Sequence, residues 1–286
     1  MHKRTILKSV TFGLLAVAAA TAQPAASGYL DVYSVRVKPD KRPQFDAIAK
    51  KWAVANRAHK GDNWVAYQVE YGEQNTLYFV GTRADYAAVD TGMNAFLGAL
   101  KASYGAGLDK LMADGDSCLI SSRSEIRTRR PDLSSNLPAD NAALSSVVGK
   151  SRFLRIVIAR TRPGRGAEWE AQLRALKQAT ERQTPSNVLT VSQSSVGQTL
   201  GTYYITSFGA SIGALQPAKS LPDLLGDRGY RDFTKANADT VIGTEIIIGR
   251  WLPELSNPPA EIASADPAFW NPKPPPTPKA KAEEKK

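Results

Sequence analysis

Two arginines at matching positions of the chain have the chemistry to bind an anion. Arg36 lies near the end of an alternating stretch at residues 29–38, and Arg160 lies near the end of a similar stretch at residues 153–161. A guanidinium offers donors in a fixed fork that matches a carboxylate or phosphate. If both side chains point into one interior, they converge and hold an anionic ligand together. The alternative is that each arginine is exposed at a strand end and pairs with a nearby acid such as Glu70.

Aromatic side chains crowd residues 64–79 and have the shape to line a pocket for a flat ligand. Trp64, Tyr67 and Tyr78 are the candidate ligand-binding members of this group. The matching stretch of the second half, residues 188–195, is polar and β-branched, so only one half supplies such a wall. Packing in a hydrophobic core explains the same aromatic residues equally well.

His59 is the only histidine after residue 22 and completes the set of candidate ligand-binding residues. A histidine can act as a proton shuttle or as an axial haem ligand. The alternative is a helix C-terminus just before Gly61, where the helix dipole favours a cation. No cofactor is expected, with haem as the alternative. One histidine, one cysteine and scattered carboxylates give no zinc-ligand spacing, so no metal site is expected either.

The elements that must position these residues occur twice along the chain. At an offset of 124 positions the two arginines coincide, and with one added residue Tyr78 falls on Tyr203. Segment 131–134 reads Pro-Asp-Leu-Ser, and segment 253–256 reads Pro-Glu-Leu-Ser. The order and near-constant spacing of these matches indicate an internal repeat.

Each copy shows the same succession of periodicities. In the first copy, alternation predicts strands at 29–38, 64–71, 76–82 and 118–127, and helical spacing predicts a helix from about 43 to 60 and a two-piece helix over 86–112. In the second copy, strands are predicted at 153–161, 187–196, 202–208 and 241–251, with helices at 168–183 and in pieces over 212–238. Each copy is therefore expected to be a ferredoxin-like β-α-β-β-α-β unit, which makes the fold class α+β.

These patterns divide the chain into five segments. They are a signal peptide at 1–22, ferredoxin-like repeat 1 at 28–130, a linker at 131–150, repeat 2 at 151–256, and a disordered Pro/Lys-rich tail at 257–286. The first segment has a basic start, a short apolar run and Ala-Thr-Ala before residue 23, which is typical of a secretory signal. A periplasmic or secreted protein is expected, with no integral membrane segment once the signal is removed.

The charge balance argues against a nucleic-acid partner. The formal net charge is +10, from 37 Lys and Arg against 27 Asp and Glu. The signal peptide and the last residues, 271–286, together carry more than half of this excess. The weak remainder over the two repeats does not make a basic groove.

The order of elements over residues 28–256 resembles the dimeric α/β-barrel superfamily, which includes antibiotic-biosynthesis-monooxygenase-like proteins. The resemblance implies that the two repeats pair sheet to sheet as an internal eight-stranded barrel. It also implies a range of activities: cofactor-free oxygenation, haem handling, isomerisation and plain binding. The expected function is binding of a small organic ligand, with cofactor-independent oxygenase or isomerase activity as the enzymatic form. The alternative is a noncatalytic interaction module; the oligomeric state and enzyme status stay open.

Overall fold

The computed structural model describes residues 24–183 and 187–272 of the 286-residue chain. The expected signal peptide and residues 273–286 of the expected tail lie outside the described residues, so cleavage and export stay predictions. Within those two ranges, no helix has the length and apolar character needed to cross a membrane.

The first half has the expected β-α-β-β-α-β order. Its strands are β1 (Tyr29–Val37), β2 (Val65–Tyr71), β3 (Thr76–Arg83) and β4 (Leu119–Arg129), and its helices are α1 (Arg42–Ala58), α2 (Ala87–Tyr104) and α3 (Leu108–Ser117). Phe45, Ile48 and Trp52 recur at helical spacing on α1 and are all buried against the sheet. Gly105 has a φ of 50° and ends α2, which separates this helix from α3.

The second half repeats the same order. Its strands are β5 (Phe153–Thr161), β6 (Leu189–Val196), β7 (Thr202–Gly209) and β8 (Val241–Trp251), and its helices are α5 (Gly166–Glu181) and α6 (Leu221–Thr240). Gly226, with a φ of 70°, interrupts α6 with a kink. This left-handed conformation is one that glycine adopts without steric cost.

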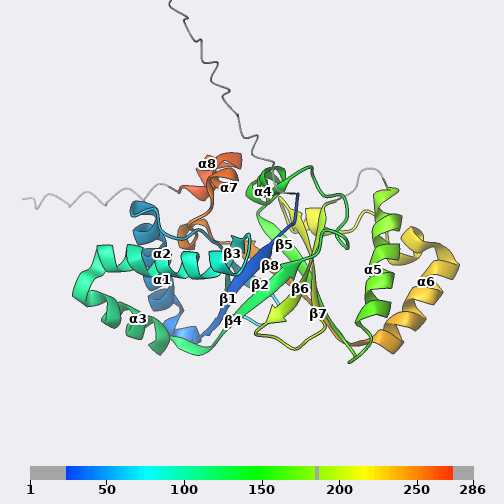
Figure 1. Cartoon of the computed structure of the whole chain (residues 1–286), viewed down its shortest axis with the longest axis horizontal. Helices are drawn as coiled ribbons and strands as arrows, with labels where there is room; N and C mark the ends of the chain where they lie inside the picture. Colours follow the sequence, from blue (N-terminus) through cyan, green and yellow to red (C-terminus); the bar gives the residue numbers. More distant parts are fainter. Residues whose placement is uncertain (1–23, 184–186, 273–286) are drawn as a thin grey trace, which may run out of the picture.

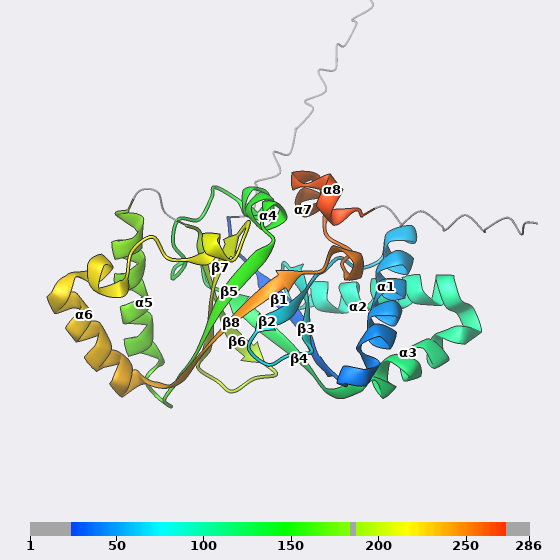
Figure 2. The same ribbon diagram turned by 180° about the vertical axis from the view of Figure 1, so that it is seen from behind.

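The eight strands close into one antiparallel barrel in the order β1-β3-β2-β8-β5-β7-β6-β4. Two seams join the halves: β2 pairs with β8, and β4 pairs with β6. Figures 1 and 2 show the barrel in the centre, with α1, α2 and α3 on one side and α5 and α6 on the other. The predicted fold class, two ferredoxin-like repeats paired as an internal α/β barrel, is confirmed.

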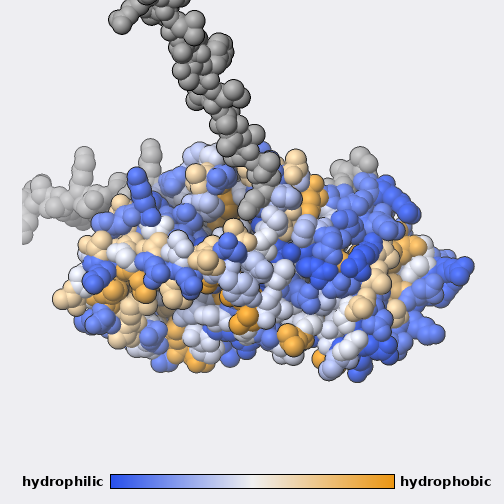
Figure 3. All heavy atoms as spheres, viewed as in Figure 1, coloured by the Kyte–Doolittle hydropathy of each residue, from blue (hydrophilic) through white to orange (hydrophobic). Residues whose placement is uncertain are grey.

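Four apolar clusters of the described residues hold this arrangement together, and the smallest packs Ala25 and Ala26 against Leu144. One lies between the outside of the barrel and α1–α3, and a smaller one lies between the barrel and α5. The third fills part of the barrel interior. On the face drawn in Figure 3, hydrophilic residues dominate over α5 and α6, and apolar residues are scattered elsewhere.

The repeated Pro-x-Leu-Ser segments fasten each half to the other. Leu133 follows the last strand of the first half and is buried with Trp169 of the second half. Leu255 follows the last strand of the second half and is buried in the apolar cluster of the first half. The Ser134 hydroxyl accepts from the Val191 amide at 2.8 Å, and the Ser256 hydroxyl accepts from the amide of residue 66 at 2.8 Å. The two contacts are equivalent and reciprocal, and we call them the clasps.

The expected linker and the first part of the expected disordered tail are both ordered. Helix α4 (Asn141–Lys150) forms in the linker, and α7 (Ala260–Ala265) and α8 (Pro267–Trp270) form after residue 257. We call these three helices the cap; they lie together at one end of the barrel (Figure 1).

The expectation of disorder was therefore wrong for residues 257–272. The Pro-rich composition hides a few apolar side chains that find a complementary surface. Trp270 is fully buried, its ring nitrogen donates to the Gly149 carbonyl at 2.8 Å, and Arg152 pairs with Asp266. A Cβ added at Gly149 would lie 2.5 Å from the Ile262 carbonyl oxygen, so a glycine is needed where α4 meets α7.

Candidate functional site

The barrel interior contains two cavities rather than a continuous packed core. The upper cavity, of about 440 Å³, lies at the end covered by α4 and α7. The lower cavity, of about 260 Å³, lies at the opposite end, beside the β2–β3 turn. Alternate residues of each strand face inward, and on β4 these are Arg123, Glu125, Arg127 and Arg129.

A buried triad of Glu125, Arg127 and Tyr204 separates the two cavities. The Tyr204 hydroxyl donates to both carboxylate oxygens of Glu125, at 2.8 and 3.0 Å, and Arg127 Nη2 donates to the same carboxylate at 2.8 Å. The guanidinium carbon of Arg127 lies 3.4 Å from the centre of the Tyr204 ring. Burial raises the pKa of Tyr204 well above its usual value, so its hydroxyl stays protonated and donates. Although burial alone would lower the pKa of Arg127, Tyr204 and Glu125 raise it, so the guanidinium stays charged.

Tyr67 and Tyr78 stack beside this triad. Their rings are 10° from parallel, with centroids 4.7 Å apart. Tyr67 lines the upper cavity, and Tyr78 lines the lower one. Burial raises the pKa of both hydroxyls, so each tyrosine is neutral at ordinary pH.

The upper cavity has apolar walls and one cationic side. Leu30, Val80, Leu154, Ile156, Phe208 and Trp251 supply apolar surface. Arg127 and Arg129 line the same cavity and come from β4. Helix α4 contributes Asn141 and Leu144, and α7 contributes Glu261 and Ile262, so the cap closes this end. A small molecule with an apolar body and a polar end would find both kinds of contact here.

The lower cavity holds the two arginines that the repeat aligns. Arg36 pairs with Glu73 at 2.8 Å, and Arg160 lies 3.9 Å from Glu245. Both side chains are nearly half exposed and line the cavity mouth. They do converge on one cavity, but each has a carboxylate partner. Glu70, the acid named as an expected partner, instead accepts from Arg250 at 2.5 Å.

The predicted ligand-binding residues therefore separate into three places. Tyr67 reaches the upper cavity, and Arg36, Tyr78 and Arg160 reach the lower one. Trp64 touches the rim of the upper cavity, but its ring packs against Phe96 in the outer cluster, and its nitrogen donates to the Leu255 carbonyl at 2.8 Å. His59 lines neither cavity; it is exposed at the C-cap of α1. The six candidate residues do not converge on one cavity, and whether any of them binds a ligand stays a prediction.

Comparison with known proteins supports this architecture. No protein-family model and no curated protein sequence matches the chain. An anthrone oxidase-like protein of known structure superposes with a TM-score of 0.50 at 12% identity, over 80% of this chain and 93% of that chain. The chain has the dimeric α/β-barrel fold.

Two other solved barrels resemble it more distantly. A candidate monooxygenase from Fusobacterium nucleatum has a TM-score of 0.49 at 12% identity, covering 79% of this chain and 93% of that one. A chlorite dismutase from Candidatus Nitrospira defluvii has a TM-score of 0.43 at 8% identity, covering 84% and 95%. These two similarities define no subfamily.

The residues of this dimeric α/β barrel do not fit a haem ligated by histidine or cysteine. His59 lies outside the barrel, and Cys118 is buried in the outer cluster behind it. Tyrosinate is a third kind of haem ligand. The raised pKa values of Tyr67 and Tyr78 disfavour that form. The donors that the described residues offer inside the barrel therefore suit an organic ligand better than a haem iron.

Sequence reasoning missed the most buried charged residues of the α/β barrel, which are Glu125 and Arg127. Their signal is the alternation of Arg123, Glu125, Arg127 and Arg129 along one strand. On an open sheet, an alternating charged face is the solvent side. Only closure of the barrel turns this face inward.

The alignment of the two halves also needs a one-residue correction. Arg36 pairs with Thr76, and Arg160 pairs with Thr202, so Tyr78 corresponds to Tyr204 and not to Tyr203. Because neighbouring residues of a strand face opposite sides, the difference matters. Tyr78 and Tyr204 both face the interior of the barrel.

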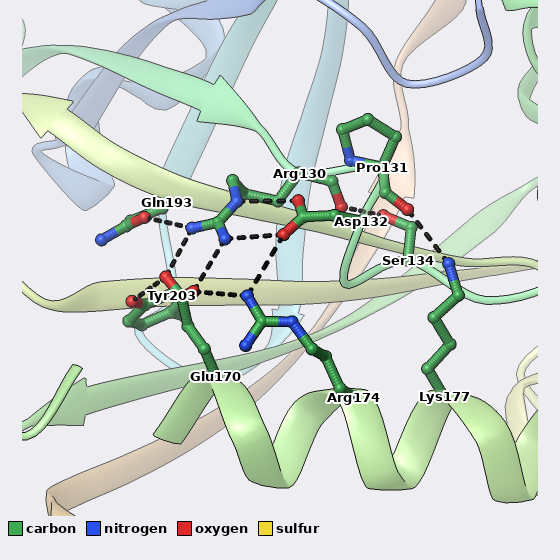
Figure 4. Close-up of polar contacts among 9 residues, drawn as sticks. All are labelled: Arg130, Pro131, Asp132, Ser134, Glu170, Arg174, Lys177, Gln193 and Tyr203. Atoms are coloured by element: carbon green, nitrogen blue, oxygen red, sulfur yellow. Dashed lines mark hydrogen bonds and ion pairs between the residues drawn. The ribbon is translucent and has the colours of Figure 1, made fainter. Parts of the chain in front are cut away.

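Tyr203 belongs to a second polar cluster outside the α/β barrel (Figure 4). Arg130 Nη1 donates to Glu170 at 2.6 Å and to Gln193 at 2.8 Å, and Arg130 also pairs with Asp132 at 2.8 Å. The Tyr203 hydroxyl donates to Glu170 at 3.0 Å. Hydrogen bonds from Arg130 lower the pKa of Glu170 and of Asp132. The cluster ties the chain after β4 to α5, which is a structural role.

Proposed function

We propose that this protein binds a small, largely apolar organic molecule in the upper cavity. The observation that carries the proposal is the cavity itself: the barrel is closed by main-chain pairing, yet about 440 Å³ of its interior is not filled by side chains. Ligand pockets commonly range from about 300 to 1,000 Å³ and are mostly apolar with a few polar groups. A barrel whose interior served only as a core would be packed more completely.

Chemistry at this site is a further part of the proposal. A cofactor-independent oxygenase or isomerase needs a base beside the substrate. Asp62 and Glu261 line the upper cavity, and Glu125 lies beside it in the buried triad. Asp62 is engaged by Arg83 at 2.6 Å and Glu125 by Arg127 at 2.8 Å, whereas Glu261 is exposed on α7. This arrangement supports ligand binding more directly than it supports catalysis. Oxygenase or isomerase activity is proposed as the enzymatic form, and a noncatalytic module is the alternative.

We also propose that the protein acts after export, as a periplasmic or secreted protein. The basic and apolar pattern of residues 1–22 supports this. Mass spectrometry of the protein from its own host tests it, because a mature chain should begin at residue 23. A full-length mass in a cytoplasmic fraction would contradict it.

A matched pair of tryptophan substitutions tests the binding site. Ile156 is 3% exposed and lines the upper cavity, so Ile156→Trp should fill the space that a ligand needs. Ile246 is 50% exposed on β8, so Ile246→Trp is the control. Isothermal titration with a naphthalene-sized neutral probe, 2-naphthamide, should show binding to the wild type and Ile246→Trp but not to Ile156→Trp. Equal binding to all three would refute the site.

Native mass spectrometry and oxygen uptake separate the enzymatic form from the alternative. A small molecule retained from the host, followed by oxygen consumption or conversion of that molecule on incubation, supports catalysis. Retention without turnover supports the noncatalytic module.

A further inference from the structure

Arg129 differs from Arg83 and Arg127, the buried arginines of the described residues that line the same cavity. It is the last residue of β4, lines the upper cavity and is partly buried. Its Nη1 atom donates to the Ser27 carbonyl at 2.9 Å and to the Asn141 side-chain oxygen at 3.1 Å. Both acceptors are neutral. Burial lowers the pKa of Arg129 to about 10, which shows that its surroundings disfavour the charge they contain.

Arg83, Arg127 and Arg130 each have a carboxylate partner, and Arg155, which is partly buried without one among the described residues, lines neither cavity. Arg83 pairs with Asp31 at 3.0 Å and with Asp62 at 2.6 Å. Arg127 pairs with Glu125 and Arg130 with Glu170, at 2.8 and 2.6 Å. In the described part of the chain, Arg129 has no carboxylate within 4.0 Å. An unpaired charge in such surroundings is costly to folding, so its presence calls for a compensating anion.

The surroundings of Arg129 indicate where that anion would come from. Two of its guanidinium nitrogens, Nε and Nη2, make no hydrogen bond to the described residues. Arg127 borders the same cavity and keeps its buried Nε without a partner. A fork of unused donors at a cavity wall suits the two oxygens of a carboxylate.

The two halves of the barrel differ at this position. Leu30 pairs with Arg127 in the first half, and Leu154 pairs with Gly249 in the second. Two residues further along, Arg129 therefore corresponds to Trp251, which also lines the cavity. One seam of the barrel thus offers a cation, and the equivalent seam offers an aromatic wall.

We propose that the ligand of the upper cavity is a small organic acid, and that Arg129 binds its carboxylate while its apolar body packs against Trp251 and Leu154. This inference rests on the proposed binding function and specifies the class of ligand. Of the other charged residues of the cavity, Asp62 and Arg83 pair with each other, and Arg127 pairs with Glu125. Glu261 is exposed on α7 and lies beyond ion-pair distance of Arg129.

The test compares an acid with its neutral isostere. Titration calorimetry near neutral pH measures the affinities of 2-naphthoate and 2-naphthamide for the full-length mature protein. The wild type should prefer the acid by about ten-fold or more, the usual effect of hydrogen bonds to a charged group. Arg129→Gln should lose that preference and keep its affinity for the amide. Arg123→Gln, which removes the same charge from the lower cavity, should keep the preference.

Each other result has a definite meaning. Equal affinity of the wild type for both probes overturns the organic-acid inference and leaves the binding function standing. A preference that survives Arg129→Gln overturns the role of Arg129. Loss of amide binding in Arg129→Gln shows that the residue supports the cavity structure and overturns its role as an anchor. Binding of neither probe to the wild type overturns the proposed function together with this inference.

Discussion

Removing Glu125 alone from the buried triad should lower the free energy of unfolding more than removing Glu125 and Arg127 together. Glu125 and Arg127 are each 5% exposed, and Tyr204 is 4% exposed. Glu125→Leu would leave the Arg127 cation inside the barrel without its carboxylate. Breaking a buried ion pair in this way costs about 3–5 kcal/mol. Tyr204→Phe keeps the ring under the guanidinium and removes only hydrogen bonds to a charged acceptor, which costs about 1.5–3 kcal/mol.

The double variant Glu125→Leu/Arg127→Met separates these costs. It removes both charges and fills the space with apolar side chains, but it leaves the buried Tyr204 hydroxyl without its acceptor. Its free energy of unfolding should therefore lie about 1–3 kcal/mol below that of the wild type and above that of Glu125→Leu. Urea unfolding followed by circular dichroism gives the free energies of unfolding. The decisive quantity is the difference between Glu125→Leu and the double variant. If the double variant is as unstable as the sum of its two single variants, the reasoning about an uncompensated charge is refuted.

Three further predictions follow from packing, the clasps and titration. A Cβ added at Gly249 would lie 2.6 Å from the Tyr67 ring, so Gly249→Ala should weaken probe binding in the calorimetric assay, whereas Gly243→Ala, where nothing lies within 4 Å, should not. Ser256→Ala leaves the buried amide of residue 66 without its acceptor, so it should lower the free energy of unfolding in urea by about 1–3 kcal/mol and speed hydrogen exchange on β2. Ser134→Ala should speed exchange on β6 instead. Unchanged exchange in either variant would contradict the role of the clasps. Burial raises the pKa of Tyr203 to about 12, so its contribution to stability is complete below the unfolded pKa of about 10 and is lost as the pH rises toward 12. Unfolding midpoints measured across this range should fall less steeply for Tyr203→Phe.

The strands and long helices of the fold could be predicted from the sequence because their periodicities are local. Each strand alternates over one face, and α1 repeats apolar residues at helical spacing, so element type follows from neighbours in the chain. The cap could not be read in this way. Whether Trp270 stays in solvent or is buried depends on the surface around Gly149, which lies far away in sequence.

The candidate site could be predicted only in part from the sequence, because only some of its features are local. The equivalence of Arg36 and Arg160 is a sequence feature, and both do reach one cavity. Which charged face points inward on β4 depends on closure of the barrel, which no single strand encodes. That no carboxylate of residues 24–183 or 187–272 pairs with Arg129 is likewise a property of several elements together, since its hydrogen-bond partners are Ser27 and Asn141 of α4.

The tandem arrangement explains how one cavity can be both apolar and cationic. In a barrel made of two identical chains, every inward residue appears on both seams. Here the two seams differ at equivalent positions. The β4–β6 seam has Arg127, Arg129 and Ser192, and the β2–β8 seam has Gly249, Trp251 and Tyr67 at the corresponding positions. Gly249 leaves the space that the Tyr67 ring occupies, and an arginine there, as on the other seam, would exclude that ring. The polar seam and the aromatic seam therefore depend on each other, and an amphipathic ligand is the kind of molecule that such a pair of walls accommodates.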